Sequence, residues 1–162
     1  MVDRSVPVNG EPLTIRFLRS TPDGVGVNLA VKIAPIGQVL LVEDDSNDRL
    51  MVEILFHSLG LALVSVSNGE DAIALLRSKD KAKPFSLMLL DIRLHGISGL
   101  DVLRIVRQEQ PDLHVVLLTG SLTPDTLNAT DITYFEVCLK PLRRADLLAI
   151  LLKHGLIHVG AL

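Results

Sequence analysis

The chain has 162 residues, about the size of one domain and enough to bury a core without metal or disulfide cross-links. Hydrophobic residues make up 48% of it but aromatic residues only 3%, so aliphatic side chains must build the interior, as is typical of helices packed on a parallel sheet. The net charge of −3 and the absence of a Lys/Arg stripe argue against direct binding of nucleic acid, which depends on neutralising phosphates.

Residues 1–37 contain no helical period and precede a repeating pattern. Residues 12–20 and 25–33 are rich in β-forming side chains and flank the turn sequence Thr21-Pro22-Asp23-Gly24. We interpret residues 1–37 as an N-terminal extension. Two interpretations stay open for it, a β-hairpin arm and a disordered segment.

From residue 38 onward, short apolar runs alternate with segments of helical period, which is the pattern of repeated strand–helix units. Strands are expected at residues 39–42, 61–66, 85–90, 113–118 and 137–139. Helices are expected to follow the first three strands and to occupy residues 142–153 at the end. The pattern predicts an α/β fold with a doubly wound, five-stranded parallel sheet over residues 38–154, followed by a short apolar tail at residues 155–162.

Two helices of this pattern carry specific expectations. The first is expected to be capped by Ser46, stopped by Gly60 and buried along a stripe of the three residues Leu50, Ile54 and Leu55. A further helix should lie at residues 123–133, but this segment has few strong helix formers. We therefore expect that helix to be short, irregular or mobile.

Polar residues stand where these strands end. Glu43 and Asp44 follow the first strand, Asp91 the third, Thr119 the fourth and Lys140 the fifth. Ligands of a doubly wound sheet bind outside the carboxyl ends of the strands. Three neighbouring carboxylates repel one another unless a cation lies between them, and Mg²⁺ prefers such oxygen ligands. The sequence therefore predicts a Mg²⁺ site formed by Glu43, Asp44 and Asp91.

Asp91 is the natural nucleophile of this set, because it begins a loop at residues 92–99 rather than lying inside a helix. Its attack on a phosphoryl donor would give an aspartyl phosphate. Thr119 would supply a hydroxyl group and Lys140 a compact cation for the other phosphoryl oxygens. Each residue alone is a weak signal, since acidic residues after a strand are most often caps or solvated turns. Their ordered placement at four strand ends favours the functional interpretation.

These residues resemble the receiver domain of two-component response regulators over about residues 38–153. The resemblance lies in Leu40-Leu41-Val42-Glu43-Asp44-Asp45, residues 89–100, Leu118-Thr119-Gly120 and Lys140-Pro141. It implies a flavodoxin-like (βα)5 fold with Asp91 as phosphoacceptor and Glu43 and Asp44 as metal ligands. It also implies the backbone carbonyl of Arg93 as a further Mg²⁺ ligand and a cis Lys140–Pro141 peptide bond.

Four positions depart from the family's usual pattern or vary within it. His95 stands where the family usually has Pro, and it is either a proton or metal group or a simple loop substitution. Val137 stands where the family has a Tyr or Phe that moves with the switch hydroxyl, which argues against the usual aromatic coupling. Arg93 and Ser121 occupy variable positions that tune dephosphorylation in the family. The Arg93 side chain either shields the acyl phosphate from water or points to solvent.

The resemblance implies a phosphodonor, either a histidine kinase or a histidine phosphotransfer protein, and a separate downstream protein target. Too few residues follow residue 153 for an effector domain, so we expect a stand-alone response regulator of a two-component phosphorelay, a signalling switch and not an enzyme. The alternative is a degenerate receiver that binds proteins independently of phosphorylation, which His95, Val137 and the weak helix at residues 123–133 favour. An enzyme that binds nucleotide or flavin is disfavoured, because no glycine-rich loop follows the first strand.

The remaining features concern location and assembly. No apolar run approaches the roughly 20 residues that span a bilayer, and the N-terminal residues lack an apolar export segment. The single Cys138 fits a reducing compartment, so a cytoplasmic protein is expected. The apolar residues 156–159 are expected to pair with the N-terminal arm, to form a homodimer contact or to continue the last helix.

Overall fold

The computed structural model describes residues 2–4, 13–20, 26–33, 38–78, 84–121 and 135–161. The turn expected at residues 21–24 and the helix expected at residues 123–133 lie outside the described residues. Within them, the Lys140–Pro141 peptide bond is cis, as expected. None of the described helices is long and apolar enough to cross a membrane.

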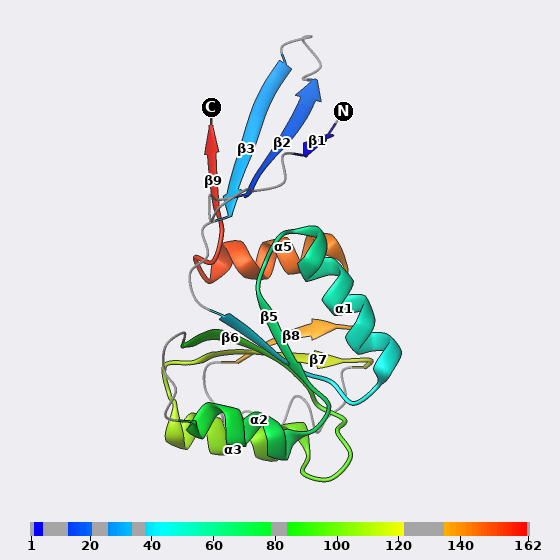
Figure 1. Cartoon of the computed structure of the whole chain (residues 1–162), viewed down its shortest axis with the longest axis vertical. Coiled ribbons are helices and arrows are strands. Elements are labelled where there is room, and N and C mark those ends of the chain that lie inside the picture. Colours follow the sequence, from blue (N-terminus) through cyan, green and yellow to red (C-terminus); the bar gives the residue numbers. More distant parts are fainter. Residues whose placement is uncertain are drawn as a thin grey trace.

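Five parallel strands form the central sheet and confirm the predicted fold class. In spatial order they are β5 (Leu63–Val66), β4 (Gln38–Val42), β6 (Phe85–Asp91), β7 (His114–Thr119) and β8 (Phe135–Leu139). Helices α1 (Ser46–Ser58) and α5 (Arg144–Lys153) lie on one face, and α2 (Gly69–Arg77) and α3 (Gly99–Glu109) on the other (Figure 1).

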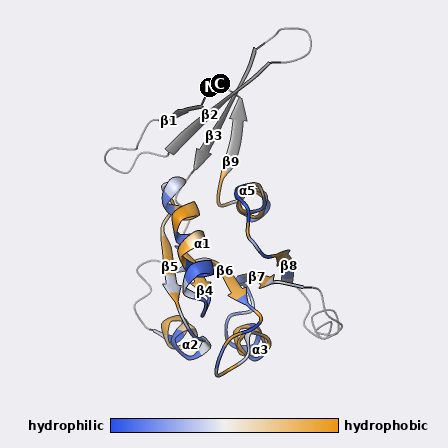
Figure 2. Ribbon diagram, turned by 90° about the vertical axis from the view of Figure 1, so that its right-hand side faces the viewer, coloured by the Kyte–Doolittle hydropathy of each residue, from blue (hydrophilic) through white to orange (hydrophobic). Residues whose placement is uncertain are grey.

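The core is divided by this sheet into two layers. Successive strand residues face opposite sides, so Leu41 and Leu89 belong to the cluster beneath α1 and α5, whereas Leu40 and Leu90 belong to the cluster beneath α2 and α3. Figure 2 shows hydrophobic residues on the central strands, and both hydrophobic and hydrophilic residues on the helices. Strands buried on both faces explain why the sequence shows continuous apolar runs rather than alternation.

Helix α1 differs from its prediction in two respects. Its N-cap is Asp45 and not Ser46, because the Asp45 side chain accepts hydrogen bonds from the N–H groups of the second and third helical residues. Its buried residues are Val52 and Phe56. Of the predicted stripe, Leu55 is partly buried against the core, whereas Leu50 and Ile54 are each 53% exposed. The predicted end is correct, since Gly60 has a φ of 64° just beyond the helix, a conformation that glycine adopts without strain.

A second sheet is built from the two ends of the described chain. Its antiparallel order is β1 (Val2–Arg4), β2 (Leu13–Ser20), β3 (Gly26–Ile33) and β9 (His158–Ala161). Strands β2 and β3 pair along their whole length, which is the arrangement that the β-hairpin interpretation of residues 1–37 describes. This sheet lies beyond α5 at one end of the molecule (Figure 1).

The apolar tail packs against the parallel sheet with its first part and joins the antiparallel sheet with its last part. Helix α5 ends at Lys153, so the tail does not continue it. Leu156 and Ile157 are buried in the core cluster beneath α1 and α5, and the next four residues form β9, which pairs with β3. Pairing with the N-terminal arm is therefore observed, while the division of the chain at residues 37/38 and 154/155 stays a prediction.

Candidate functional site

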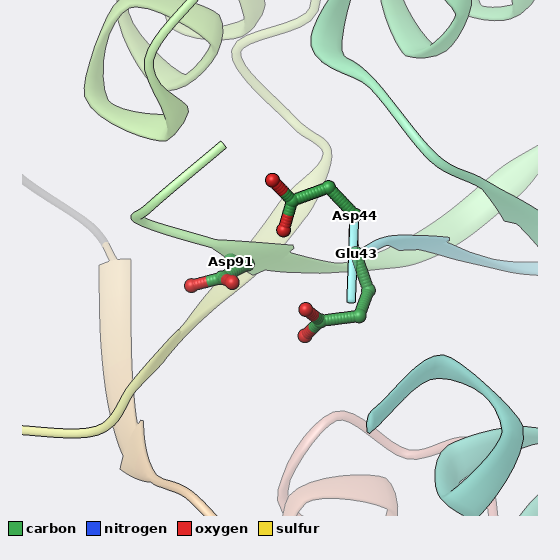
Figure 3. Close-up of side chains that lie close together, drawn as sticks. All are labelled: Glu43, Asp44 and Asp91. Carbon is green, nitrogen blue, oxygen red and sulfur yellow. The ribbon is translucent and has the colours of Figure 1, made fainter. Parts of the chain in front are cut away.

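Three carboxylates meet at the edge of the sheet where the parallel strands end. Glu43 and Asp44 directly follow β4, and Asp91 is the last residue of the neighbouring strand β6. Parallel pairing of Val42 with Leu90 brings the two strand ends level. One oxygen of each carboxylate lies within 4.8 Å of the other two. Figure 3 shows the three side chains gathered at this edge.

Lys140 is the cation of this acidic edge. Its Nζ lies 2.8 Å from Asp91 Oδ2 and 2.6 Å from Glu43 Oε2. A third carboxylate oxygen, Asp48 Oδ2 in the first turn of α1, lies 3.1 Å away. Burial alone would lower the pKa of Lys140, but the hydrogen bond to Asp91 and the adjacent Glu43 carboxylate outweigh burial and raise the pKa. The ammonium group is therefore held in its charged form among the carboxylates.

Glu43 is fully buried, and its environment disfavours its charge. Burial raises its pKa to about 7, Lys140 opposes this shift and Asp91 adds to it. Although Glu43 Oε2 lies 2.6 Å from Lys140 Nζ, it accepts no hydrogen bond of acceptable geometry. A buried carboxylate oxygen without a hydrogen bond, beside further carboxylate oxygens, is a suitable ligand for a hard divalent cation. The residues of the edge therefore fit Mg²⁺.

The loop after Asp91 is fixed by close backbone packing. The Arg93 N–H donates a hydrogen bond to Asp91 Oδ1 at 3.0 Å, and Ser98 caps the N-terminus of α3. A Cβ on Gly99 would lie only 2.0 Å from the carbonyl oxygen of Asp91, so α3 can start this close to β6 only with glycine there. Asp91 thus begins a short, closed loop, and the Arg93 carbonyl stays a predicted ligand.

Three further residues hold the acidic edge. No role was expected for Asp48 or Arg49, whereas His95 was expected to be either a proton or metal group or a simple loop substitution. Asp48 is the first, because its carboxylate forms an ion pair with Lys140. Arg49 is the second, because its Nη1 donates to the Glu43 carbonyl oxygen at 2.8 Å. His95 is the third: its backbone N–H donates to Asp44 Oδ2 at 3.0 Å, and its ring Nδ1 contacts the same oxygen. Burial would raise the pKa of Asp44, but the bonds from His95 lower it.

A sequence signal existed for two of these three residues. Asp48 and Arg49 fall in the first turn of the helix that follows the acidic pair, so proximity to the strand ends was foreseeable. His95 stood out only by replacing the usual Pro. Its contact with Asp44 had no local signal, because it joins residues 51 positions apart.

Thr119 lies buried at the end of β7, but its hydroxyl group is directed to its own loop. Thr119 Oγ1 donates to the Ser121 carbonyl oxygen at 2.7 Å, and the Ser121 N–H lies 3.3 Å from Oγ1. Arg93 Nη2 donates to Ser121 Oγ at 3.1 Å, so the two variable positions are joined. Val137 pairs with Leu117 in the sheet and packs at the margin of the core beneath α2 and α3.

Comparison with known proteins relates this arrangement to one family. A family model described as the response regulator receiver domain matches residues 39–152. The cell cycle transcriptional regulator CtrA of Caulobacter vibrioides is 35% identical over 89 residues, which cover 55% of this chain and 37% of CtrA. The uncharacterized transcriptional regulatory protein YkoG of Bacillus subtilis is 32% identical over 116 residues, which cover 70% of this chain and 48% of YkoG. The chain therefore spans less than half the length of these relatives.

Solved structures show the same fold. The receiver domain of sensor histidine kinase PA1611 from Pseudomonas aeruginosa, with a magnesium ion coordinated in its active site cleft, has a TM-score of 0.64 and 27% identity. The match covers 74% of this chain and 98% of that one. The chemotaxis protein CheY4 of Vibrio cholerae also has a TM-score of 0.64, with 20% identity over 73% of this chain and 98% of that one.

Proposed function

The chain belongs to the response regulator receiver family, and from this premise we propose that it accepts a phosphoryl group on Asp91 in a two-component phosphorelay. Glu43, Asp44 and Asp91, with the Arg93 backbone carbonyl, would hold the Mg²⁺ ion. The observation that carries the proposal is the position of Lys140, whose Nζ lies within 2.8 Å of carboxylate oxygens of both Asp91 and Glu43. A lysine with a purely structural role at the surface would not be expected to contact two buried carboxylates.

The residues suggest how the transfer proceeds. An Asp91 carboxylate oxygen attacks the phosphorus of the donor, the bond from phosphorus to the donor atom breaks, and the donor leaves with that electron pair. When bound, the divalent ion supplies positive charge that offsets the negative charge of the transferring group. Lys140 would provide a second, fixed positive charge, since its Nζ lies 2.8 Å from Asp91 Oδ2, and such positioning supplies most of the catalysis in phosphoryl transfer.

The test is the intact mass of the protein after incubation with acetyl phosphate or phosphoramidate, with and without Mg²⁺. We expect a gain of one phosphoryl group that requires Mg²⁺ and is absent in Asp91→Asn. Asp101→Asn is the matched control, because Asp101 is an exposed aspartate in the first turn of α3. Labelling of Asp91→Asn at the wild-type rate would refute the assignment of Asp91.

We further propose that a histidine kinase or histidine phosphotransfer protein supplies the phosphoryl group and that the receiver acts on a separate protein target. Beside the acidic edge, α1 exposes the apolar side chains of Leu50, Met51 and Ile54, a patch suited to a protein donor. Ile54→Ser is expected to slow transfer from a protein donor but not from acetyl phosphate. Equal slowing with both donors would contradict this role for α1.

A second candidate function is a degenerate receiver that binds its partner independently of phosphorylation. Two observations favour it: the Thr119 hydroxyl group donates to the Ser121 carbonyl oxygen, and an aliphatic Val137 occupies the usual aromatic position. Absence of labelling by small donors and by a cognate kinase, in a folded protein that still binds its target, would establish this alternative.

A further inference from the structure

Asp44 is held by one residue of a distant loop. The backbone N–H of His95 donates to Asp44 Oδ2 at 3.0 Å, and the Nδ1 atom of its ring contacts the same oxygen. The His95 side chain is 98% exposed, whereas that of Asp44 is 15% exposed. The imidazole is therefore held in place by its contact with Asp44 and not by burial.

The backbone contact depends on the residue type at position 95. A proline there would have no N–H group to donate. The two other N–H groups on either side are also bound to carboxylates: Arg93 N–H donates to Asp91 Oδ1 at 3.0 Å and Ile97 N–H to Glu70 Oε1 at 3.2 Å. Alternate N–H groups of the loop thus donate to carboxylates from three separate parts of the chain, and the path of the loop is fixed on both sides of His95.

This arrangement determines how Asp44 can serve a cation. Oδ2 carries both contacts from His95, which leaves Oδ1 as the Asp44 oxygen that His95 does not contact. Asp44 offers one carboxylate oxygen within 4.8 Å of oxygens of Glu43 and Asp91. Hydrogen bonds to a ligating carboxylate orient it, and loss of such partners typically weakens metal binding about 10–100-fold.

We propose that His95 is a positioning residue for the metal site, which acts by holding the Asp44 carboxylate in the orientation that a divalent cation requires. This inference rests on the proposed function of the acidic edge, because it assigns His95 a role toward the ion that Glu43, Asp44 and Asp91 would bind.

The test measures metal affinity directly, without a phosphodonor. Mg²⁺ binding is measured by calorimetry and Mn²⁺ binding by electron paramagnetic resonance, both on the full chain at pH 8. His95→Ala retains the backbone donor but loses the ring, and we expect it to raise the Kd for both ions about 10-fold. His95→Asn places an amide donor close to the position of Nδ1 and is expected to restore affinity to within about threefold of wild type.

His57→Ala is the matched control, because His57 is also exposed but lies in the last turn of α1; its Kd should equal that of wild type. A Kd for His95→Ala within twofold of wild type, or a tighter one, would overturn the inference about His95. The proposed function would remain in that case, provided that the wild-type chain binds Mg²⁺. Failure of the wild-type chain to bind either ion would overturn both.

Discussion

Lys140 Nζ lies 2.8 Å from Asp91 Oδ2, although β8, which ends just before Lys140, and β6, which ends at Asp91, are separated in the sheet by β7. The lysine side chain reaches across the end of β7, where its own backbone N–H is bound to the Thr119 carbonyl oxygen at 2.7 Å. The same Nζ lies 2.6 Å from Glu43 Oε2. One cation therefore neutralises part of the charge of two buried carboxylates.

Replacement of Lys140 by Met is expected to slow phosphoryl labelling of Asp91 by about 10²-fold or more, the usual effect of removing one fixed positive group from a transition state. The rate is measured by intact mass with acetyl phosphate at saturating Mg²⁺. Lys153→Met is the matched control, because Lys153 forms an ion pair with Glu136 away from the acidic edge. Labelling of Lys140→Met within fivefold of wild type would argue against a role in transfer.

Glu43 should make the stability of the metal-free protein depend on pH. Burial raises its pKa from 4.5 to about 7, so between these pH values the folded state binds more protons than the unfolded state. The free energy of unfolding therefore falls as pH rises from about 5 to 7.5, by on the order of 1–3 kcal/mol. Urea unfolding across this range, compared with Glu43→Gln, checks the prediction; the mutant should lose this part of the slope.

The same protonation competes with metal. Mg²⁺ requires the ionised carboxylate, so its affinity should increase as pH rises through about 7, with release of a proton on binding. Calorimetry in two buffers of different ionisation enthalpy measures the proton release. A Kd that is constant from pH 6 to 8 would show that Glu43 is already ionised in the folded protein.

The sequence predicted the sheet well because its strands are buried on both faces and end in polar residues. It misplaced the buried face of α1, because this helix carries two apolar sets at helical spacing: Leu50 and Ile54 form one, and Val52 and Phe56 the other. Periodicity alone does not distinguish them. Only the packing of the finished sheet decides that the second set faces the core.

The acidic edge was predicted from strand order, since the carboxyl ends of parallel strands share one edge. The contacts that depend on loop paths and side-chain directions were not predicted. The bond between His95 and Asp44 depends on the path of a loop, and the direction of the Thr119 hydroxyl group depends on the turn that contains Ser121. Neither is encoded in a local pattern of polarity.

Arg93 and Ser121 should act together on the lifetime of the aspartyl phosphate. Arg93 follows Asp91 by two residues, and its Nη2 donates to Ser121 Oγ at 3.1 Å. We propose that this bridge restricts access of water to the aspartyl phosphate. On this basis Arg93→Ala and Ser121→Ala should each speed dephosphorylation about 2–10-fold, the effect of one exposed hydrogen bond. Loss of label is followed by intact mass after removal of the donor. The double mutant should be no faster than Arg93→Ala, whereas additive effects would indicate that the two side chains act separately.

Ile157 tests whether the tail stabilises the domain. It lies beyond the end of α5 but is only 1% exposed and belongs to the core cluster that includes Phe56 and Leu147. Truncation to Ala removes buried methyl and methylene groups and leaves a cavity, so Ile157→Ala should lower the free energy of unfolding by about 2–5 kcal/mol. Leu152→Ala, at a position on α5 that is 40% exposed, should lower it by less than about 1 kcal/mol. Urea denaturation of both variants decides the matter: equal, small losses would mean that the tail is not part of the core in solution.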